Sequence, residues 1–173
     1  MVNGRAFIHI SVFVHLCDNL RWFQPDRLCC KTKYIAWNAA DCDGDGVTNG
    51  DEITDGTDPL DECSYLTASI TVAVTSTADC DGDGVTNDDE AADGTDGQDP
   101  CSFVLASQTV APSAAWNAAD CDGDGVTNGD EVTDGTDPLD ECDFVIASQT
   151  VAPSAAWNAA DCDGDGVTNG DEV

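Results

Sequence analysis

Residues 41–52 read DCDGDGVTNGDE, and the rest of the sequence is best understood outward from this stretch. Its first nine letters begin again at Asp79, Asp120 and Asp161, so successive copies are 38, 41 and 41 residues apart. Self-similarity at such a period is typical of repeat proteins, in which each unit is stabilised by its neighbours. The sequence predicts four repeats, at 37–74, 75–115, 116–156 and 157–173, the last of them truncated.

Each copy matches the ligand pattern of a twelve-residue calcium-binding loop. Carboxylates occupy positions 1, 3, 5 and 12, a glycine permits the sharp turn at position 6, a backbone carbonyl follows at 7, and an asparagine stands at 9. Alternate carboxylates can surround one hard cation, and the glutamate can close the site with two oxygens. The predicted metal ligands are Asp41, Asp43, Asp45, Val47, Asn49 and Glu52; Asp79, Asp81, Asp83, Val85, Asn87 and Glu90; Asp120, Asp122, Asp124, Val126, Asn128 and Glu131; and Asp161, Asp163, Asp165, Val167, Asn169 and Glu172.

Calcium suits this ligand set better than magnesium does, because magnesium demands a near-ideal octahedron that rarely includes so many protein carboxylates. The alternative interpretation is that the loops are solvated acidic linkers. Four copies with glycine and glutamate in register favour binding over that alternative. We therefore expect four or more calcium ions to be bound as cofactors.

Charge is distributed very unevenly along the 173 residues. All five Lys and Arg residues and both His residues precede Trp37, whereas all but two of the 35 Asp and Glu residues follow it. Such a balance repels nucleic acid and anionic membranes and favours cations as partners. Without bound cations, the acidic region is expected to be disordered. No apolar run reaches the length of about 18 residues that a membrane-spanning helix needs, so no membrane span is predicted.

The ten cysteines indicate an oxidising compartment. Seven of them fall at regular intervals in the repeats, which is typical of a disulfide framework in an exported protein. We therefore expect the protein to be extracellular or at the cell surface. Residues 1–36 form an atypical head with three open interpretations: an export signal, a wrongly assigned start, or a separately folded module.

The intervals between cysteines suggest which pairs form disulfides. Two cysteines of one repeat are always 21 residues apart, whereas the intervals from one repeat to the next are 17, 20 and 20. The constant interval favours bridges within repeats, each adding roughly 3 kcal/mol of stability, and the alternative is bridges between neighbouring repeats. The predicted pairs are Cys42–Cys63, Cys80–Cys101 and Cys121–Cys142. This pairing leaves Cys162 without a partner, so we expect the array to continue beyond Val173.

The segments between the loops (64–78, 102–119 and 143–160), called spacers below, are expected to contain short strands. Ile70, Val72 and Val74 alternate with small or polar residues, which is the period of a half-buried strand. The later spacers are strand-like over 103–110 and 144–151. One strand per repeat cannot form a sheet alone, so it must pair with a neighbouring repeat or another chain. One or two helical turns, capped by Ser113, are expected before the third loop.

No catalytic constellation appears in the sequence: the histidines lie only in the head, and neither GxSxG nor a phosphate-binding loop occurs. Tryptophans at 37, 116 and 157 stand four residues before a loop, and Thr75 takes this place before the second loop. We interpret these rings as packing anchors, with carbohydrate stacking as the alternative. Ser and Thr residues of the spacers are candidates for O-linked glycans.

The flanks of the loops exclude the paired long helices of an EF-hand sensor, because Gly56 and Pro59 follow Glu52 almost at once. The loop motif, the short tail and the cysteines over 37–173 resemble thrombospondin type 3 repeats and their relatives in large secreted bacterial surface proteins. The resemblance implies little regular structure around calcium and disulfides that tie the units. It also implies a second ion for each unit, held by tail carboxylates such as Asp55 and Asp58, Asp93 and Asp96, or Asp134 and Asp137. The spacers are longer than those of the family's compact units.

The sequence therefore predicts a repeat protein with low regular secondary structure, built from calcium-loop units and short β-strand spacers in a linear rod or fibre. We expect a non-enzymatic, disulfide-tied structural segment that calcium rigidifies and that self-associates through its spacers into a filament. The alternative function is an adhesive or dockerin-like recognition module that binds a partner protein or a carbohydrate.

Overall fold

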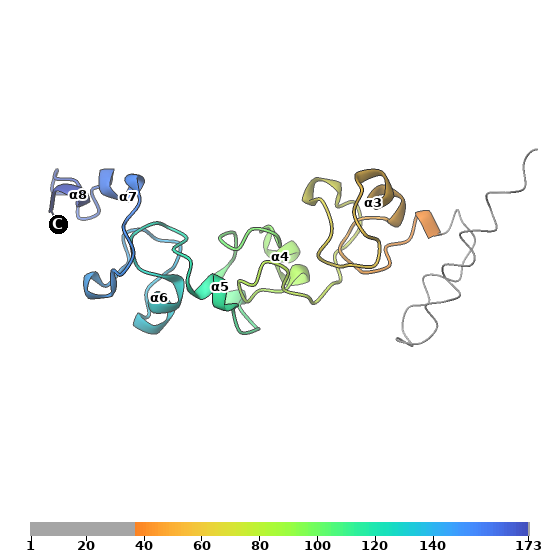
Figure 1. The fold of residues 1–173 in the computed structure, drawn as a ribbon, viewed down its shortest axis with the longest axis horizontal. Coiled ribbons are helices and arrows are strands. Elements are labelled where there is room, and N and C mark those ends of the chain that lie inside the picture. The colour runs from red at the N-terminus through yellow and green to blue at the C-terminus, as the bar shows by residue number, and fades with distance from the viewer. Residues whose placement is uncertain (1–36, 173) are drawn as a thin grey trace, which may run out of the picture. The chain divides into compact units, whose positions relative to one another are not determined.

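The computed structural model describes residues 37–172, so the interpretations of the head fall outside the described residues. The chain divides into two compact units, Met1–Ala73 and Val74–Val173, and each is described by itself. The first contains one acidic loop and the second contains the other three (Figure 1). Among the described residues, short helices and turns make up the regular structure.

A short helix begins within the second half of each acidic loop. These helices are α3 (Asn49–Asp55), α4 (Asn87–Asp93), α6 (Asn128–Asp134) and α8 (Asn169–Glu172). In α3, the Thr48 side chain caps the amino end by accepting from the Asp51 N–H. Acidic residues in the first turn interact favourably with the positive end of the helix dipole. Gly56 ends the helix in the left-handed conformation at φ 83°, where its N–H donates to the Glu52 carbonyl. The first three helices thus end within one turn of the position-12 glutamate, which agrees with the exclusion of long flanking helices.

The expected spacer strands are absent from the described residues. Each spacer instead contains one turn of 3-10 helix: η2 (Thr67–Ser69), η3 (Leu105–Ser107) and η4 (Ile146–Ser148). After η3, the N–H groups of Thr109 and Val110 both donate to the Gly84 carbonyl of the preceding loop, at 2.9 and 3.1 Å. The strand prediction is wrong because these backbone N–H groups donate to the loop carbonyl and so do not form the hydrogen-bond ladder that pairing with a second strand requires.

The second half of the two later spacers forms the predicted capped helical turn. These helices are α5 (Ala114–Asn117) and α7 (Ala155–Ala159). The hydroxyl oxygen of Ser113 accepts from the Trp116 N–H at 3.0 Å, so Ser113 is the N-cap that the sequence predicted.

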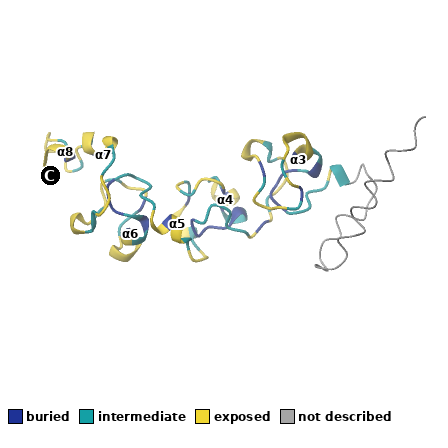
Figure 2. Ribbon diagram, in the orientation of Figure 1, coloured by how far each residue is buried: buried dark blue, intermediate teal, exposed yellow. Residues whose placement is uncertain are grey.

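The tryptophan of α5 packs onto the repeat that precedes it. Trp116 forms a buried cluster with Val85 and Phe103, and its ring meets Phe103 edge-on at 5.4 Å between centroids. Figure 2 shows that the buried stretches of the ribbon are short and lie between exposed and intermediate ones. Its indole N–H donates to the Pro100 carbonyl at 2.9 Å. Trp157 repeats this arrangement against Phe144, at 5.5 Å. Both rings are almost fully buried, so they are packing residues and present no open face to a sugar.

The disulfides join neighbouring repeats. Cys101 is bonded to Cys121 and Cys142 to Cys162, with Cα–Cα distances of 5.4 Å in both. The predicted pairs Cys80–Cys101 and Cys121–Cys142 are therefore wrong, and Cys162 has a partner. The hydrogen bond from the Trp116 indole to the Pro100 carbonyl links the residues just before the third loop to the residue next to Cys101, which favours this pairing. Cys42, Cys63 and Cys80 are also disulfide-bonded.

Candidate calcium-binding loops

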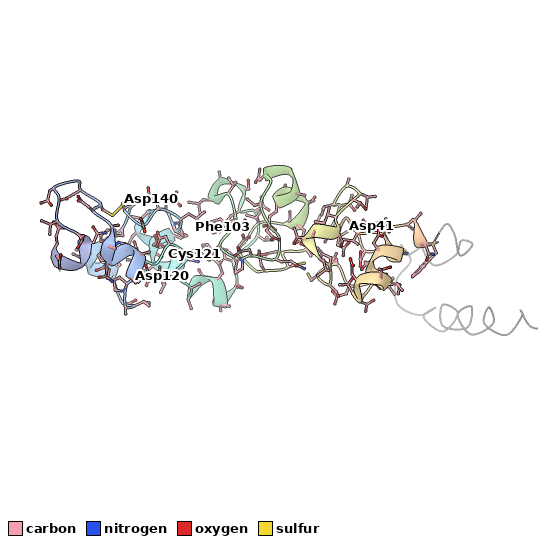
Figure 3. The ribbon with its side chains drawn as sticks, turned by 90° about the horizontal axis from the view of Figure 1, so that it is seen from above. Asp41, Phe103, Asp120, Cys121 and Asp140 are labelled. Carbon is pink, nitrogen blue, oxygen red and sulfur yellow. A yellow bond between two sulfur atoms is a disulfide. The ribbon has the colours of Figure 1, made fainter. Side chains whose placement is uncertain are left out.

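Three aspartates of each loop converge on one point. Asp41, Asp43 and Asp45 each offer a carboxylate oxygen within 4.8 Å of the others, and the same holds for the corresponding aspartates of the other three loops. Figure 3 draws these side chains, with Asp41 and Asp120 labelled as the first members of two of the groups. Positions 1, 3 and 5 of the predicted pattern are thus brought together in all four copies.

The loop backbone holds these carboxylates in place. Asp41 accepts from the N–H groups of Gly44 and Gly46, at 2.7 and 3.0 Å, so one carboxylate fixes the backbone at positions 4 and 6 of the loop. The Val47 N–H donates to Asp45 at 2.8 Å. Gly46 has φ 92°, a conformation that favours glycine and explains the glycine at position 6. The geometry therefore follows from local sequence alone.

Several carboxylate oxygens in the first three loops are buried and lack any hydrogen-bond partner. They are Asp43 Oδ2, Asp45 Oδ2 and both Glu52 oxygens; Asp81 Oδ2, Asp83 Oδ2 and both Glu90 oxygens; and Asp122 Oδ2, Asp124 Oδ2 and both Glu131 oxygens. A buried carboxylate oxygen without a donor or a cation is strongly unfavourable. Each of these three loops thus offers four acceptor oxygens without a donor, which supply part of the oxygen shell that a hard divalent cation requires.

The electrostatics of the loops lead to the same requirement. Burial, reinforced by Asp43, Asp45 and Asp41, raises the pKa of Glu52 to about 8. Burial likewise raises the pKa of Glu90 and of Glu131 to about 8. These carboxyls would hold protons near neutral pH unless a cation replaces them. A metal ion bound in such a loop would displace protons from these carboxyls.

The asparagine at position 9 is placed differently from the aspartates. Asn49 accepts from the Cys42 N–H at 3.2 Å and donates to the Trp37 carbonyl at 2.8 Å. Asn128 makes the equivalent bonds to the Cys121 N–H and the Trp116 carbonyl, at 3.0 and 3.1 Å. The amide thus joins position 9 of the loop to position 2 and to the backbone four residues before the loop, a role that the sequence alone did not reveal. Ligation at this position often runs through water, so direct ligation by asparagine stays a prediction.

The position-7 valine is buried in the first three loops, and ligation by its carbonyl likewise stays a prediction. The tail aspartates show no second convergent group: among the described residues, the groups close enough for a metal are the four aspartate triads. Asp55 instead accepts from the Ser69 hydroxyl, and Asp58 from the Leu60 N–H. A second ion in each repeat remains a prediction of the resemblance.

The fourth loop has the same local geometry but lies open to solvent. Asp161 accepts from Gly164 and Gly166 at 2.7 and 3.0 Å, as its counterparts do. All three of its aspartates are exposed, and so is Glu172. The pKa of Glu172 is raised mainly by the negative charge of Asp163, with burial second.

Comparison with protein families finds one family model that matches the four segments containing the loops. Residues 41–62, 79–100, 120–141 and 161–173 each match the family model of the bacterial TSP3 repeat. The chain carries four bacterial TSP3 repeats. This confirms the resemblance drawn from the loop motif, and the matched segments leave the spacers between the TSP3 repeats uncovered. Neither the curated proteins nor the solved structures yielded a match to the chain.

TSP3 repeats are structural calcium-binding units and are not known as enzymes. Together with the disulfides they indicate an extracellular protein. Within residues 37–172, every helix is too short or too polar to cross a lipid bilayer.

Proposed function

We propose that the chain is an extracellular structural array in which each TSP3 repeat binds calcium through its aspartate triad and the glutamate at position 12. The observation that carries the proposal is the set of buried, partnerless oxygens on Asp81, Asp83 and Glu90 and on their counterparts in the first and third loops. A hard cation would satisfy these oxygens, and no donor among residues 37–172 does. Four such loops make calcium a component of the fold.

Bound calcium would supply positive charge at the centre of each loop, where the carboxylates otherwise repel one another. Asp41, Asp43 and Asp45 would hold the ion together with Glu52, while the Gly44 and Gly46 N–H groups keep Asp41 in position. Without the ion, burial and like charge raise the pKa of Glu52 to about 8, so the empty loop either takes up protons or opens. Calcium is therefore expected to rigidify the repeats.

The links between repeats fit a structural role. A disulfide and a buried tryptophan connect consecutive repeats at Cys101–Cys121 with Trp116, and again at Cys142–Cys162 with Trp157. Disulfides persist in oxidising compartments, and calcium sites of extracellular modules stay filled at dissociation constants of about 10⁻⁴–10⁻³ M. We do not propose filament formation through paired spacer strands, because no spacer strand occurs within residues 37–172.

The proposal is tested by adding a chelator to the calcium-loaded protein and recording far-ultraviolet circular dichroism and the sedimentation coefficient. We expect loss of helical signal and a slower, expanded particle at neutral pH. The Glu90→Gln variant should weaken calcium binding at one site. Asp89→Asn is the matched control, because Asp89 is adjacent and accepts from the Thr86 hydroxyl outside the aspartate triad. Unchanged spectra and sedimentation after chelation would contradict the proposal.

A further inference from the structure

The asparagine at position 9 of the third loop is fully buried, and both ends of its side-chain amide are bonded to the protein. Asn128 is 0 % exposed. Its carbonyl oxygen accepts from the Cys121 N–H at 3.0 Å, while its amide nitrogen donates to the Trp116 carbonyl at 3.1 Å and to Cys121 Sγ at 3.3 Å. These partners fix the orientation of the amide, because the reversed group would place its oxygen against the Trp116 carbonyl.

The carboxylates of the same loop are in a different situation. Asp122, Asp124 and Glu131 have buried oxygens without a hydrogen-bond partner, whereas no atom of Asn128 belongs to this set. A cation at the centre of the loop would satisfy those carboxylates, but at Asn128 it would compete with hydrogen bonds that the side chain already makes. The hydrogen bonds of Asn128 therefore favour a role other than direct coordination.

The bonds of Asn128 connect the two halves of the loop. Cys121 is at position 2, between the predicted ligands Asp120 and Asp122, and Figure 3 labels Asp120 and Cys121. Asn128 is the first residue of α6, and the first turn of this helix contains Glu131 at position 12. A bond between positions 9 and 2 thus holds the start of α6, and with it the glutamate, against the half of the loop that carries the aspartates.

Backbone contacts reinforce this connection. The Asn128 N–H donates to the Ala119 carbonyl, directly before the loop, at 2.8 Å. A Cβ added to the next residue, Gly129, would lie 2.9 Å from the Asn117 carbonyl oxygen. The beginning of α6 therefore packs tightly against the end of α5, and the side chain of Asn128 lies at this junction.

We infer that Asn128 is a positioning residue of the third calcium site, in place of the direct ligation predicted from the sequence. Its side-chain amide clamps the start of α6 to position 2, so that Glu131 completes the site. Asn87 has the same role in the second loop, where it accepts from the Cys80 N–H at 3.3 Å and donates to Cys80 Sγ at 3.0 Å. The inference rests on the proposed calcium-binding function.

The substitution Asn128→Asp separates a clamp from a ligand. It keeps the size of the side chain and its oxygen, adds a negative charge and removes both N–H donors. A direct ligand would bind calcium at least as tightly after this change, because a carboxylate attracts the ion more strongly than an amide does. A clamp loses two hydrogen bonds, so we expect the third site to bind calcium more weakly by about tenfold or more.

Calcium affinity is measured on the full-length chain by competition with a chromophoric chelator. Glu131→Gln identifies the third site, so adding Asn128→Asp to that variant should weaken calcium binding no further. Asn117→Asp is the matched control, because it adds the same charge to an exposed side chain that donates to the Pro112 and Ser113 carbonyls, outside the loop. The control should bind calcium as tightly as the unmodified chain or slightly more tightly.

A second measurement detects the clamp independently of affinity. At saturating calcium, amide hydrogen exchange at Cys121 should rise in Asn128→Leu, which removes the acceptor as well as the donors, and stay unchanged in Asn117→Asp. A side chain that served only as a ligand would leave the Cys121 amide protected once calcium is bound. Exchange in α4, within the preceding repeat, reports whether the leucine variant is folded; if it is not, Asn128→Asp decides alone.

Calcium binding by Asn128→Asp as tight as that of the unmodified chain would overturn the inference, and so would an unchanged exchange rate at Cys121 in folded Asn128→Leu. Both outcomes are distinct from failure of the proposed function, which would appear as no saturable calcium binding by the unmodified chain.

Discussion

Replacing Trp116 by alanine tests the link between the second and third repeats. The Trp116 side chain is 1 % exposed and packs against Val85 and Phe103, so its removal leaves a cavity that the short surrounding turns cannot fill. Loss of a buried tryptophan costs about 3–5 kcal/mol of unfolding free energy. That range includes the edge-on contact with Phe103, which contributes about 0.5–1.5 kcal/mol beyond burial.

A second substitution separates packing from hydrogen bonding. Trp116→Phe keeps an aromatic ring but loses the indole N–H that donates to the Pro100 carbonyl at 2.9 Å. We expect this variant to lose roughly 1–2 kcal/mol, from one hydrogen bond and some unfilled volume. Val132→Ala is the control, since Val132 is 51 % exposed on α6 and should change stability by less than about 0.5 kcal/mol.

The assay is urea-induced unfolding at saturating calcium with the disulfides intact, followed by far-ultraviolet circular dichroism because the substitutions alter tryptophan fluorescence. The expected order of stability is unmodified protein and Val132→Ala, then Trp116→Phe, then Trp116→Ala. A loss for Trp116→Ala below about 1 kcal/mol, or no difference from Val132→Ala, would refute the packing argument.

Three further predictions concern the disulfides, pH and the loop glycines. Peptide mapping by mass spectrometry should recover Cys101 linked to Cys121, and replacing both with serine should cost about 3 kcal/mol; a link from Cys101 to any other cysteine would contradict the structure. Because burial raises the pKa of Glu90 from 4.5 to about 8, the calcium-free fold should be most stable below pH 4.5 and lose stability as pH rises to about 8. Calcium affinity should rise over the same pH window, so thermal melts with chelator and with calcium should show opposite trends, and parallel trends would count against this assignment. Gly84→Ala should cost more in thermal melts than Gly94→Ala: both glycines have positive φ, but only at Gly84 does an added Cβ meet atoms within 3 Å, and equal losses would remove the steric argument.

The loops were predictable from sequence because their determinants are local. Asp41, Asp43 and Asp45 lie within five residues of one another, and the glycine turns between them fix their convergence. Ser113 was recognisable as a helix cap for the same reason, since its partner is only three residues away. In both cases, short-range chemistry determines the structure without reference to the rest of the chain.

The spacers could not be predicted in this way. Alternation of Ile70, Val72 and Val74 indicates a strand only if a partner strand is available, and the backbone donors of Thr71 and Val72 bond to Gly46 instead. This competition between a ladder and a loop carbonyl depends on tertiary contacts. The backbone hydrogen bonds of the position-9 asparagine were not predicted because the calcium-loop pattern assigns this residue only as a metal ligand.

The predicted pairs Cys80–Cys101 and Cys121–Cys142 were wrong because a constant interval was taken as the sign of a bridge. The pairs that form instead follow the packing of Trp116 and Trp157 onto the preceding repeat. One sequence signal did exist: the interval between cysteines of successive repeats shortens from 20 to 17 where Thr75 replaces the tryptophan. The interval is therefore longer where a tryptophan helix such as α5 lies between the two cysteines, which indicates that the disulfide forms across this helix.

Calcium stoichiometry measured by equilibrium dialysis is the most direct test of the central claim. At millimolar calcium and neutral pH, the four loops predict at least four ions bound to each chain. The Asp81→Asn, Glu90→Gln double variant should bind one ion fewer while its other sites remain filled. No saturable uptake by the unmodified chain, or the same uptake by the double variant, would contradict the account.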